Sequence, residues 1–87
     1  MAMILVTYDL KQPGRNYDAV HAYLRAFTHC KGLESVWLLD TPVSAERIRN
    51  DLMEYIDRND VLFVTPLGHG WAAYSYSCAD WLNQRTW

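Results

Sequence analysis

The stretch Met3-Ile4-Leu5-Val6-Thr7-Tyr8-Asp9 runs apolar and β-branched residues directly into a carboxylate. Residues of this kind fit a pleated surface, so the stretch predicts a β-strand. Its apolar side chains fall on both faces of that strand. A strand apolar on both faces needs cover on both sides, as in the middle of a sheet. Asp9 stands where the strand gives way to a loop, a position where α/β folds often place chemistry.

The length and composition of the chain predict one small domain over residues 1–87. Of its 87 residues 51% are hydrophobic, which is enough apolar material for a core. The formal net charge is −2, without a block of like charges, and this counts against strong binding to DNA. No run approaches the ~18 apolar residues of a membrane span, and no secretory signal precedes the first strand. We therefore expect a cytoplasmic protein without a membrane partner.

The two cysteines lie far apart in the sequence. Cys30 and Cys78 form no CxxC pair, so neither a disulfide framework nor a zinc ribbon is indicated. A single bridge between them is compatible with the spacing. In a cytoplasmic protein, however, two reduced thiols are the favoured interpretation.

Turn signals and apolar spacing divide the rest of the chain into elements. A helix is predicted over about 16–28, with Asn16 as its N-cap. Residues 28–32 are predicted to end this helix, with Gly32 able to adopt a positive φ. A second helix is predicted after Ser44, which is a good N-cap. Extended segments are predicted over 33–41, 61–65 and 71–76, and a short helix over 78–83, capped by Ser77.

Two amphipathic helices can cover one face of a four-stranded sheet. Few residues remain for the second face, and a second copy of the chain would cover it economically. The predicted fold is therefore α+β: a ferredoxin-like βαββαβ sandwich with an extra C-terminal strand and tail, dimerising through its sheet face. We assign Tyr8, Trp37 and Trp71 to the dimer interface, with Trp37 equally suited to the core.

Several short motifs resemble those of known families. The opening strand with its terminal Tyr8-Asp9, the segment Ser35-Val36-Trp37, and Asn59-Asp60-Val61-Leu62-Phe63-Val64 resemble the small subunit of the CRISPR adaptation complex, a ferredoxin-like endonuclease and scaffold family. A closer pattern is that of small bacterial and phage proteins labelled SinR-like. They share Val6-Thr7-Tyr8-Asp9-Leu10, Pro13-Gly14, Leu33-Glu34-Ser35-Val36-Trp37 and Asp80-Trp81-Leu82. VapD-like toxins, which offer a ribonuclease alternative, share the same fold.

The resemblance implies a dimer in which Asp9 of each protomer lies near the two-fold axis and binds a shared divalent metal, Mg²⁺ or Mn²⁺. A metal between two facing carboxylates relieves their repulsion and can polarise a phosphate. Asp9 is then the catalytic and metal-binding residue of an endonuclease acting on DNA or RNA. Lys11 and Arg15 would steady the phosphate.

Other residues extend or limit this interpretation. His69, between two glycines, is a candidate general base or nucleic-acid contact. His29-Cys30 beside Lys31 lacks a second ligand pair and does not indicate a metal site. Because basic residues are sparse, a second function class stays open: a non-catalytic dimeric scaffold or partner-binding module that keeps the fold without the chemistry.

Overall fold

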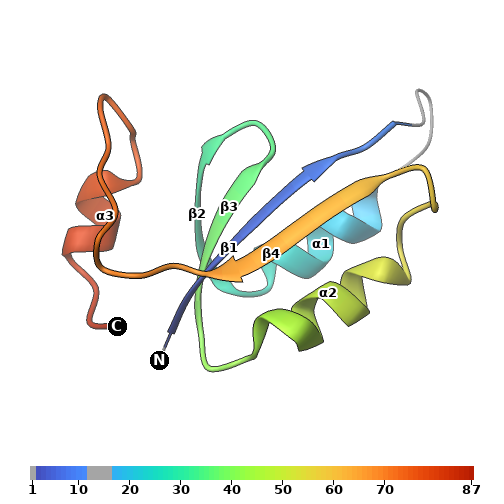
Figure 1. The fold of residues 1–87 in the computed structure, drawn as a ribbon, viewed down its shortest axis with the longest axis horizontal. Coiled ribbons are helices and arrows are strands. Elements are labelled where there is room, and N and C mark those ends of the chain that lie inside the picture. The colour runs from blue at the N-terminus through green and yellow to red at the C-terminus, as the bar shows by residue number, and fades with distance from the viewer. Residues whose placement is uncertain (1, 12–16) are drawn as a thin grey trace.

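The opening strand lies in the interior of the sheet. The computed structural model describes residues 2–11 and 17–87, and shows an α+β fold with one antiparallel sheet in the order β2-β3-β1-β4 (Figure 1). The elements in chain order are β1 (Ala2–Asp9), α1 (Asp18–Arg25), β2 (Thr28–Leu33), β3 (Val36–Thr41), α2 (Ala45–Met53), β4 (Val61–Pro66) and α3 (Ala79–Asn83). The prediction that β1 needs cover on both faces is confirmed, because each face of the sheet carries its own buried cluster.

Helices α1 and α2 cover one face of the sheet. Val20 and Leu24 of α1, and Ile48 and Leu52 of α2, are buried against apolar side chains of β1 and β3. These residues recur at the four-residue spacing that predicts an amphipathic helix. We call this side the helix face. It holds the larger of the two core clusters.

The two helices begin differently. Ser44 caps α2 as predicted, since its hydroxyl accepts a hydrogen bond from the backbone N–H of Arg47 at 3.1 Å. Helix α1 spans only Asp18–Arg25, and the predicted cap Asn16 lies outside the described residues. The prediction that helix one runs on to residue 28 is wrong at its C-terminal end.

The segment after α1 is a strand rather than a helix end. Residues Thr28–Leu33 pair antiparallel with β3, so the interpretation of Gly32 as a helix terminator is wrong. The register shifts between Cys30 and Leu33, which indicates a bulge or similar irregularity. Backbone pairing with β3 places this largely polar sequence at the edge of the sheet.

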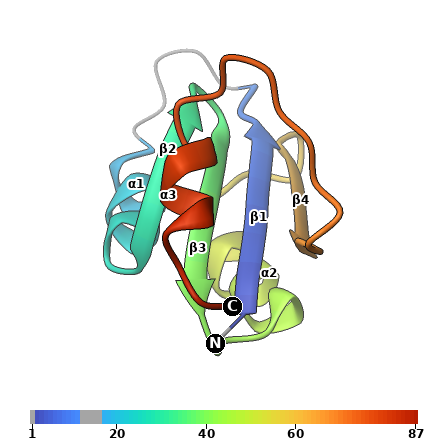
Figure 2. The same ribbon diagram turned by 90° about the vertical axis from the view of Figure 1, so that its left-hand side faces the viewer.

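The C-terminal segment covers part of the opposite sheet face. Met3 and Leu38 of the sheet are buried together with Cys78 and Leu82, and Trp71, Trp81 and Trp87 pack around them. Figure 2 shows α3 in front of β2 and β3, and the segment that follows β4 running past the top of the sheet. Residues 71–76 form a loop, so the predicted additional strand is wrong. The short terminal helix is confirmed, although it begins after Cys78 and has no side-chain cap.

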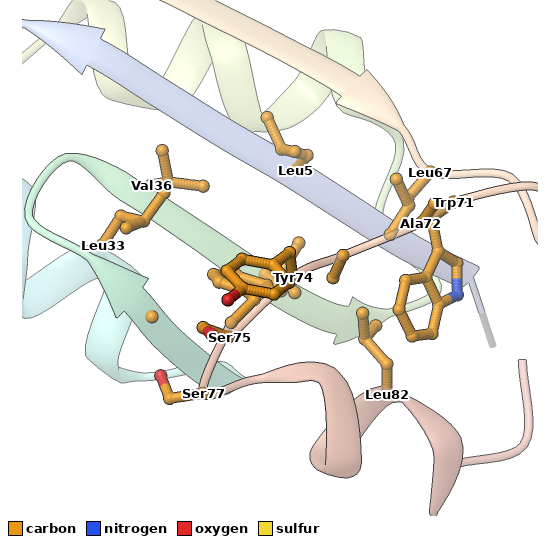
Figure 3. Close-up of a pocket in the computed structure, with 14 residues that line it drawn as sticks. Leu5, Leu33, Val36, Leu67, Trp71, Ala72, Tyr74, Ser75, Ser77 and Leu82 are labelled. Carbon is orange, nitrogen blue, oxygen red and sulfur yellow. The ribbon is translucent and has the colours of Figure 1, made fainter.

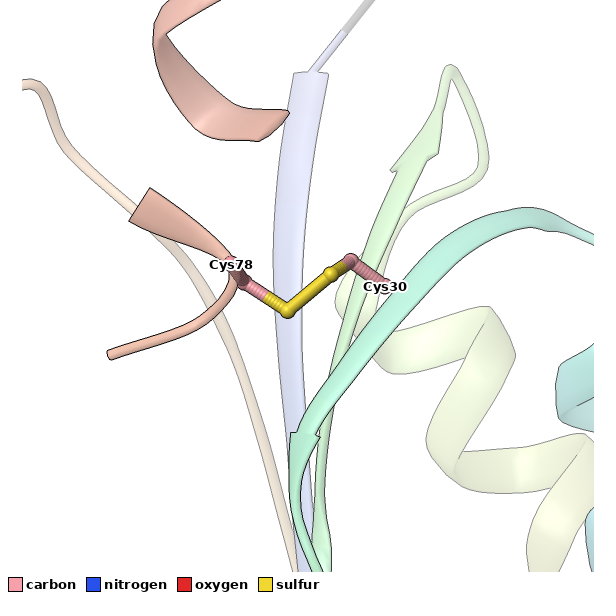
Figure 4. Close-up of a disulfide and its surroundings, with 2 residues drawn as sticks. All are labelled: Cys30 and Cys78. Carbon is pink, nitrogen blue, oxygen red and sulfur yellow. A yellow bond between two sulfur atoms is a disulfide. The ribbon is translucent and has the colours of Figure 1, made fainter. Parts of the chain in front are cut away.

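A disulfide ties this segment to the sheet. Cys78, just before α3, is bonded to Cys30 of β2 (Figure 4). The prediction of reduced thiols is therefore wrong. Because disulfides are typical of oxidising compartments, the bond does not support a cytoplasmic location, which stays a prediction. Among the described residues, no helix has the length and apolar character needed to cross a membrane.

Candidate functional site

The second face of the sheet is built of rows that cross all four strands. Paired residues of antiparallel neighbours share a face, so one row joins Leu33 of β2, Val36 of β3, Thr7 of β1 and Phe63 of β4. We call this the open row. The next row contains Leu38, which is 2% exposed because the C-terminal segment covers it.

The open row is accessible over its length. Leu33 is 58% exposed and Phe63 is 60% exposed, while Val36 and Thr7 between them are half-buried. Val61 lies beyond this row, opposite Asp9, and is 51% exposed. Four of the six large apolar side chains that are exposed in residues 2–11 and 17–87 belong to this surface or to the adjoining loop; the four are Leu33, Val61, Phe63 and Tyr74.

A groove of about 700 Å³ separates the sheet from the loop of residues 71–77 (Figure 3). Its floor includes Leu5 and Val36, and aromatic side chains of the loop form its other wall, among them Trp71 and Tyr74. Tyr74 is 94% exposed. Burial raises the pKa of the Tyr76 hydroxyl, so this phenol stays protonated at neutral pH. The groove thus presents an uncharged, mainly apolar surface continuous with the open row.

Asp9 and Lys11 lie at the end of β1, beyond the open row. The Lys11 ammonium lies 3.1 Å from the Asp9 carboxylate, and the two side chains are 49% and 65% exposed. An ion pair this exposed contributes little to stability. The carboxylate is accessible to a cation from outside, and Lys11 is accessible to an anion.

Asp60, which lies close to the Asp9–Lys11 ion pair, has a structural role. Its carboxylate accepts hydrogen bonds from the backbone N–H of Lys11 at 2.7 Å and from the Tyr17 hydroxyl at 2.9 Å. It also accepts from the backbone N–H of Asp57 at 2.9 Å. Asp60 therefore fixes the turn before β4 to the end of β1, and its oxygens are engaged within the chain.

The carboxylates do not form a metal site within one chain. No group of three or more His, Cys, Asp or Glu side chains with the spacing of a metal site occurs in the part of the chain that the structure describes. Asp9 offers a single carboxylate, whereas Mg²⁺ is commonly held by one or two carboxylates together with water and substrate phosphate. A second protomer that supplies its own Asp9 would raise the number of carboxylates at the predicted ion to two.

The other two residues predicted to contact nucleic acid are His69 and Arg15. His69 stacks on Trp87 with ring centroids 3.9 Å apart, and its Nε2 donates to the Trp87 carbonyl at 2.7 Å. Arg15 lies outside the described residues. The structure thus brings Lys11 and Asp9 together, while His69 is anchored against the C-terminal segment.

The three residues assigned to the dimer interface divide between the two faces. Trp37 is 2% exposed within the helix-face core, and its indole N–H donates to the Tyr8 hydroxyl at 3.0 Å. Trp71 lines the groove on the opposite face. In a dimer formed through the open row, Trp71 is the one of the three that is placed on the pairing side. Their interface role stays a prediction.

Sequence reasoning missed the groove and the open row. Phe63 and Leu33 alternate with inward-facing neighbours as in any two-sided strand, so nothing in the pattern marks them as exposed. Their exposure depends on how far the C-terminal segment, which the disulfide joins to β2, reaches across the sheet. The pairing of the two cysteines was the available signal, because it would have brought residue 78 onto β2.

Comparison of the chain with protein-family models, curated proteins and solved structures gives no match. The resemblance to the CRISPR adaptation subunit, to SinR-like proteins and to VapD-like toxins therefore stays a prediction.

Proposed function

We propose that the protein is a ferredoxin-like interaction module that pairs with a second copy of itself through the open row. The element order βαββαβ and the antiparallel sheet support the ferredoxin-like assignment. The observation that carries the pairing is the largely apolar row Leu33-Val36-Thr7-Phe63, on a face that the C-terminal segment covers only in part. Contiguous exposed apolar surface of this kind marks interaction sites.

The row is suited to a two-fold partner. Thr7, the smallest side chain of the row, separates Phe63 on one flank from Val36 and Leu33 on the other. A two-fold axis at Thr7 places each Phe63 against the Leu33–Val36 flank of the other copy, so that the same contact forms twice. Because the row itself carries no charge, contact between the two rows requires no charged side chain of the row to be buried.

Light scattering tests the proposal with two matched variants. We expect the wild-type chain to have the mass of a dimer at micromolar concentration. Phe63→Ser should give the mass of a monomer. Met53→Ser removes a side chain of similar exposure, 56%, from α2 on the other side of the molecule and should leave the dimer intact. A monomeric wild-type chain, or a Phe63→Ser variant with the mass of a dimer, would contradict the proposal.

A second candidate function is that of a metal-dependent endonuclease, and the position of Asp9 favours it. Asp9 follows Thr7 by two residues, so it lies on the same face of the sheet and close to the proposed axis. Pairing through the open row would bring two exposed carboxylates together. Mg²⁺ or Mn²⁺ held between them would replace Lys11 as the cation beside each carboxylate and would polarise a phosphodiester. Lys11 would then be free to contact the phosphate.

Nuclease assays separate the two functions. Single- and double-stranded DNA and RNA are incubated with the wild-type chain and with Asp9→Asn in Mg²⁺ or Mn²⁺. Cleavage by the wild-type chain that is lost in Asp9→Asn supports the endonuclease. Equal activity in both proteins, or activity in neither, would contradict the endonuclease function. The interaction module would then be the function that stands.

A further inference from the structure

Three basic side chains from two elements surround the buried ring of Trp37 on the helix face. The ring of His21, from α1, stacks on it at a centroid distance of 6.4 Å with an interplanar angle of 22°. The ring of His29, from β2, lies 5.1 Å from it, and the Lys31 ammonium lies 5.4 Å from its centroid. His21 and His29 are half-buried and Lys31 is exposed. We call this cluster the α1–β2 seam.

The hydrogen bond made by His29 fixes which of its ring nitrogens is available. Its Nδ1 lies 2.8 Å from the carbonyl oxygen of Phe27. A carbonyl can only accept, so Nδ1 carries the hydrogen. The lone pair of neutral His29 is therefore on Nε2. Protonation at Nε2 turns this atom into a charged hydrogen-bond donor, which suits an anionic ligand.

Lys31 is the formal positive charge that lies against the Trp37 ring. Lys31 rests over an aromatic face, whereas Lys11, Arg47 and Arg85 each lie against a carboxylate. Other titratable groups near the histidines are Tyr8 of β1, whose ring centroid lies 6.3 Å from that of His21, and Asp18 and Arg25, which lie about one turn to either side of His21 along α1. Glu34 follows β2 in the turn to β3.

We propose that the α1–β2 seam binds the phosphate group of a phosphorylated ligand. Lys31 supplies a permanent positive charge, and His21 and His29 add charged N–H donors when protonated. Trp37 is too deeply buried to stack on a base, so recognition is confined to the phosphate. This site goes beyond the proposed pairing, since it lies on the opposite face of the sheet and needs no second copy.

Titration with inorganic phosphate at about pH 6, followed by NMR of the histidine rings, tests the site. We expect saturable shifts of the His21 and His29 resonances.

Two charge-matched variants locate the binding. Lys31→Gln removes an exposed cation from the seam and should weaken phosphate binding about tenfold without unfolding the chain. Arg49→Gln removes an exposed cation from α2 and should leave the affinity unchanged. Equal affinities of the two variants, or shifts that grow linearly without saturation, would overturn the proposal.

A short single-stranded RNA distinguishes the sources of the phosphate. If it competes with inorganic phosphate for the same histidine resonances, the seam accepts the phosphates of a polynucleotide. If inorganic phosphate saturates the seam and the RNA does not compete, the ligand is a small phosphorylated molecule. Either result supports the proposed phosphate site. The absence of saturable binding by inorganic phosphate would contradict it.

Discussion

Gly32 of β2 lies against the C-terminal segment. A Cβ atom at this position would lie 2.4 Å from Cε1 of Tyr76 and 3.0 Å from Sγ of Cys78. Real Cβ atoms essentially never approach a neighbour as closely as the first of these distances. The glycine is therefore needed for the ring of Tyr76 to lie this close to β2.

Gly32→Ala should lower the free energy of unfolding by about 1–3 kcal/mol, because the added methyl group displaces Tyr76 or bends β2. Gly70→Ala is the matched control, since nothing lies within 4 Å of a Cβ built there. Urea unfolding followed by tryptophan fluorescence measures both. Equal midpoints for the two variants would show that the segment does not pack against Gly32.

Tyr23 and Asp51 link the two helices. The Tyr23 hydroxyl donates to the Asp51 carboxylate at 2.6 Å. This hydrogen bond is the main cause that lowers the pKa of Asp51 from its ordinary value of 3.8, and the Arg47 guanidinium acts in the same direction. Burial of Tyr23, followed by the same hydrogen bond, raises the pKa of its hydroxyl.

These shifts give the stability a defined dependence on pH. A carboxyl group whose pKa is lowered on folding stabilises the fold above its unfolded pKa, and this stability is lost as pH falls through the folded pKa. Tyr23→Phe keeps the ring and removes the donor. The variant should be less stable than the wild-type chain at neutral pH, and the difference should shrink as pH falls below 3.8 and through the lowered pKa of Asp51. A difference in thermal midpoint that stays constant as the carboxyl group becomes protonated would contradict this account.

The strand β2 and the loop at residues 71–76 show where local sequence misleads. Thr28–Leu33 has no apolar alternation, and only pairing with β3 makes it a strand. Trp71–Tyr76 is rich in aromatic residues that favour strands, but it has no neighbour to pair with. Ser75 has φ of 55°, in the left-handed region, and breaks the extended run. In both segments tertiary contacts override propensity.

The disulfide determines how firmly the C-terminal segment is held. It joins cysteines 48 residues apart, and closing a loop of that length removes considerable entropy from the unfolded chain. Replacing both Cys30 and Cys78 with alanine should lower the free energy of unfolding by about 4 kcal/mol. Urea unfolding of the wild-type chain, with and without a thiol reductant, provides the comparison. An unchanged midpoint in the variant would show that the bond contributes nothing.

Much of the architecture could be predicted from the sequence. The strands β1, β3 and β4 and the helices α1 and α2 follow from apolar spacing, together with the Ser44 cap of α2. The prediction that the sheet is covered on both faces is also confirmed. The cover of its second face was not predicted, because reduced thiols were the favoured interpretation of Cys30 and Cys78 and because the sequence does not show how far α3 reaches across β2 and β3.

The candidate site could be predicted only in part. Asp9 and Lys11 do lie together at the end of β1. The groove and the open row arise from incomplete cover, and the α1–β2 seam arises where two half-buried histidines meet a tryptophan. These features depend on neighbours that are distant along the chain, so a single sequence does not display them.

The molecule has two surfaces on opposite sides of its sheet, a row suited to pairing and a seam suited to phosphate. The pairing is tested most directly by an isotope-filtered NOE experiment on a mixture of labelled and unlabelled chains. We predict intermolecular NOEs from the ring of Phe63 to the methyl groups of Leu33 and Val36 of the partner subunit. Intermolecular NOEs confined to α1 and α2, or none in a concentrated sample, would contradict the account.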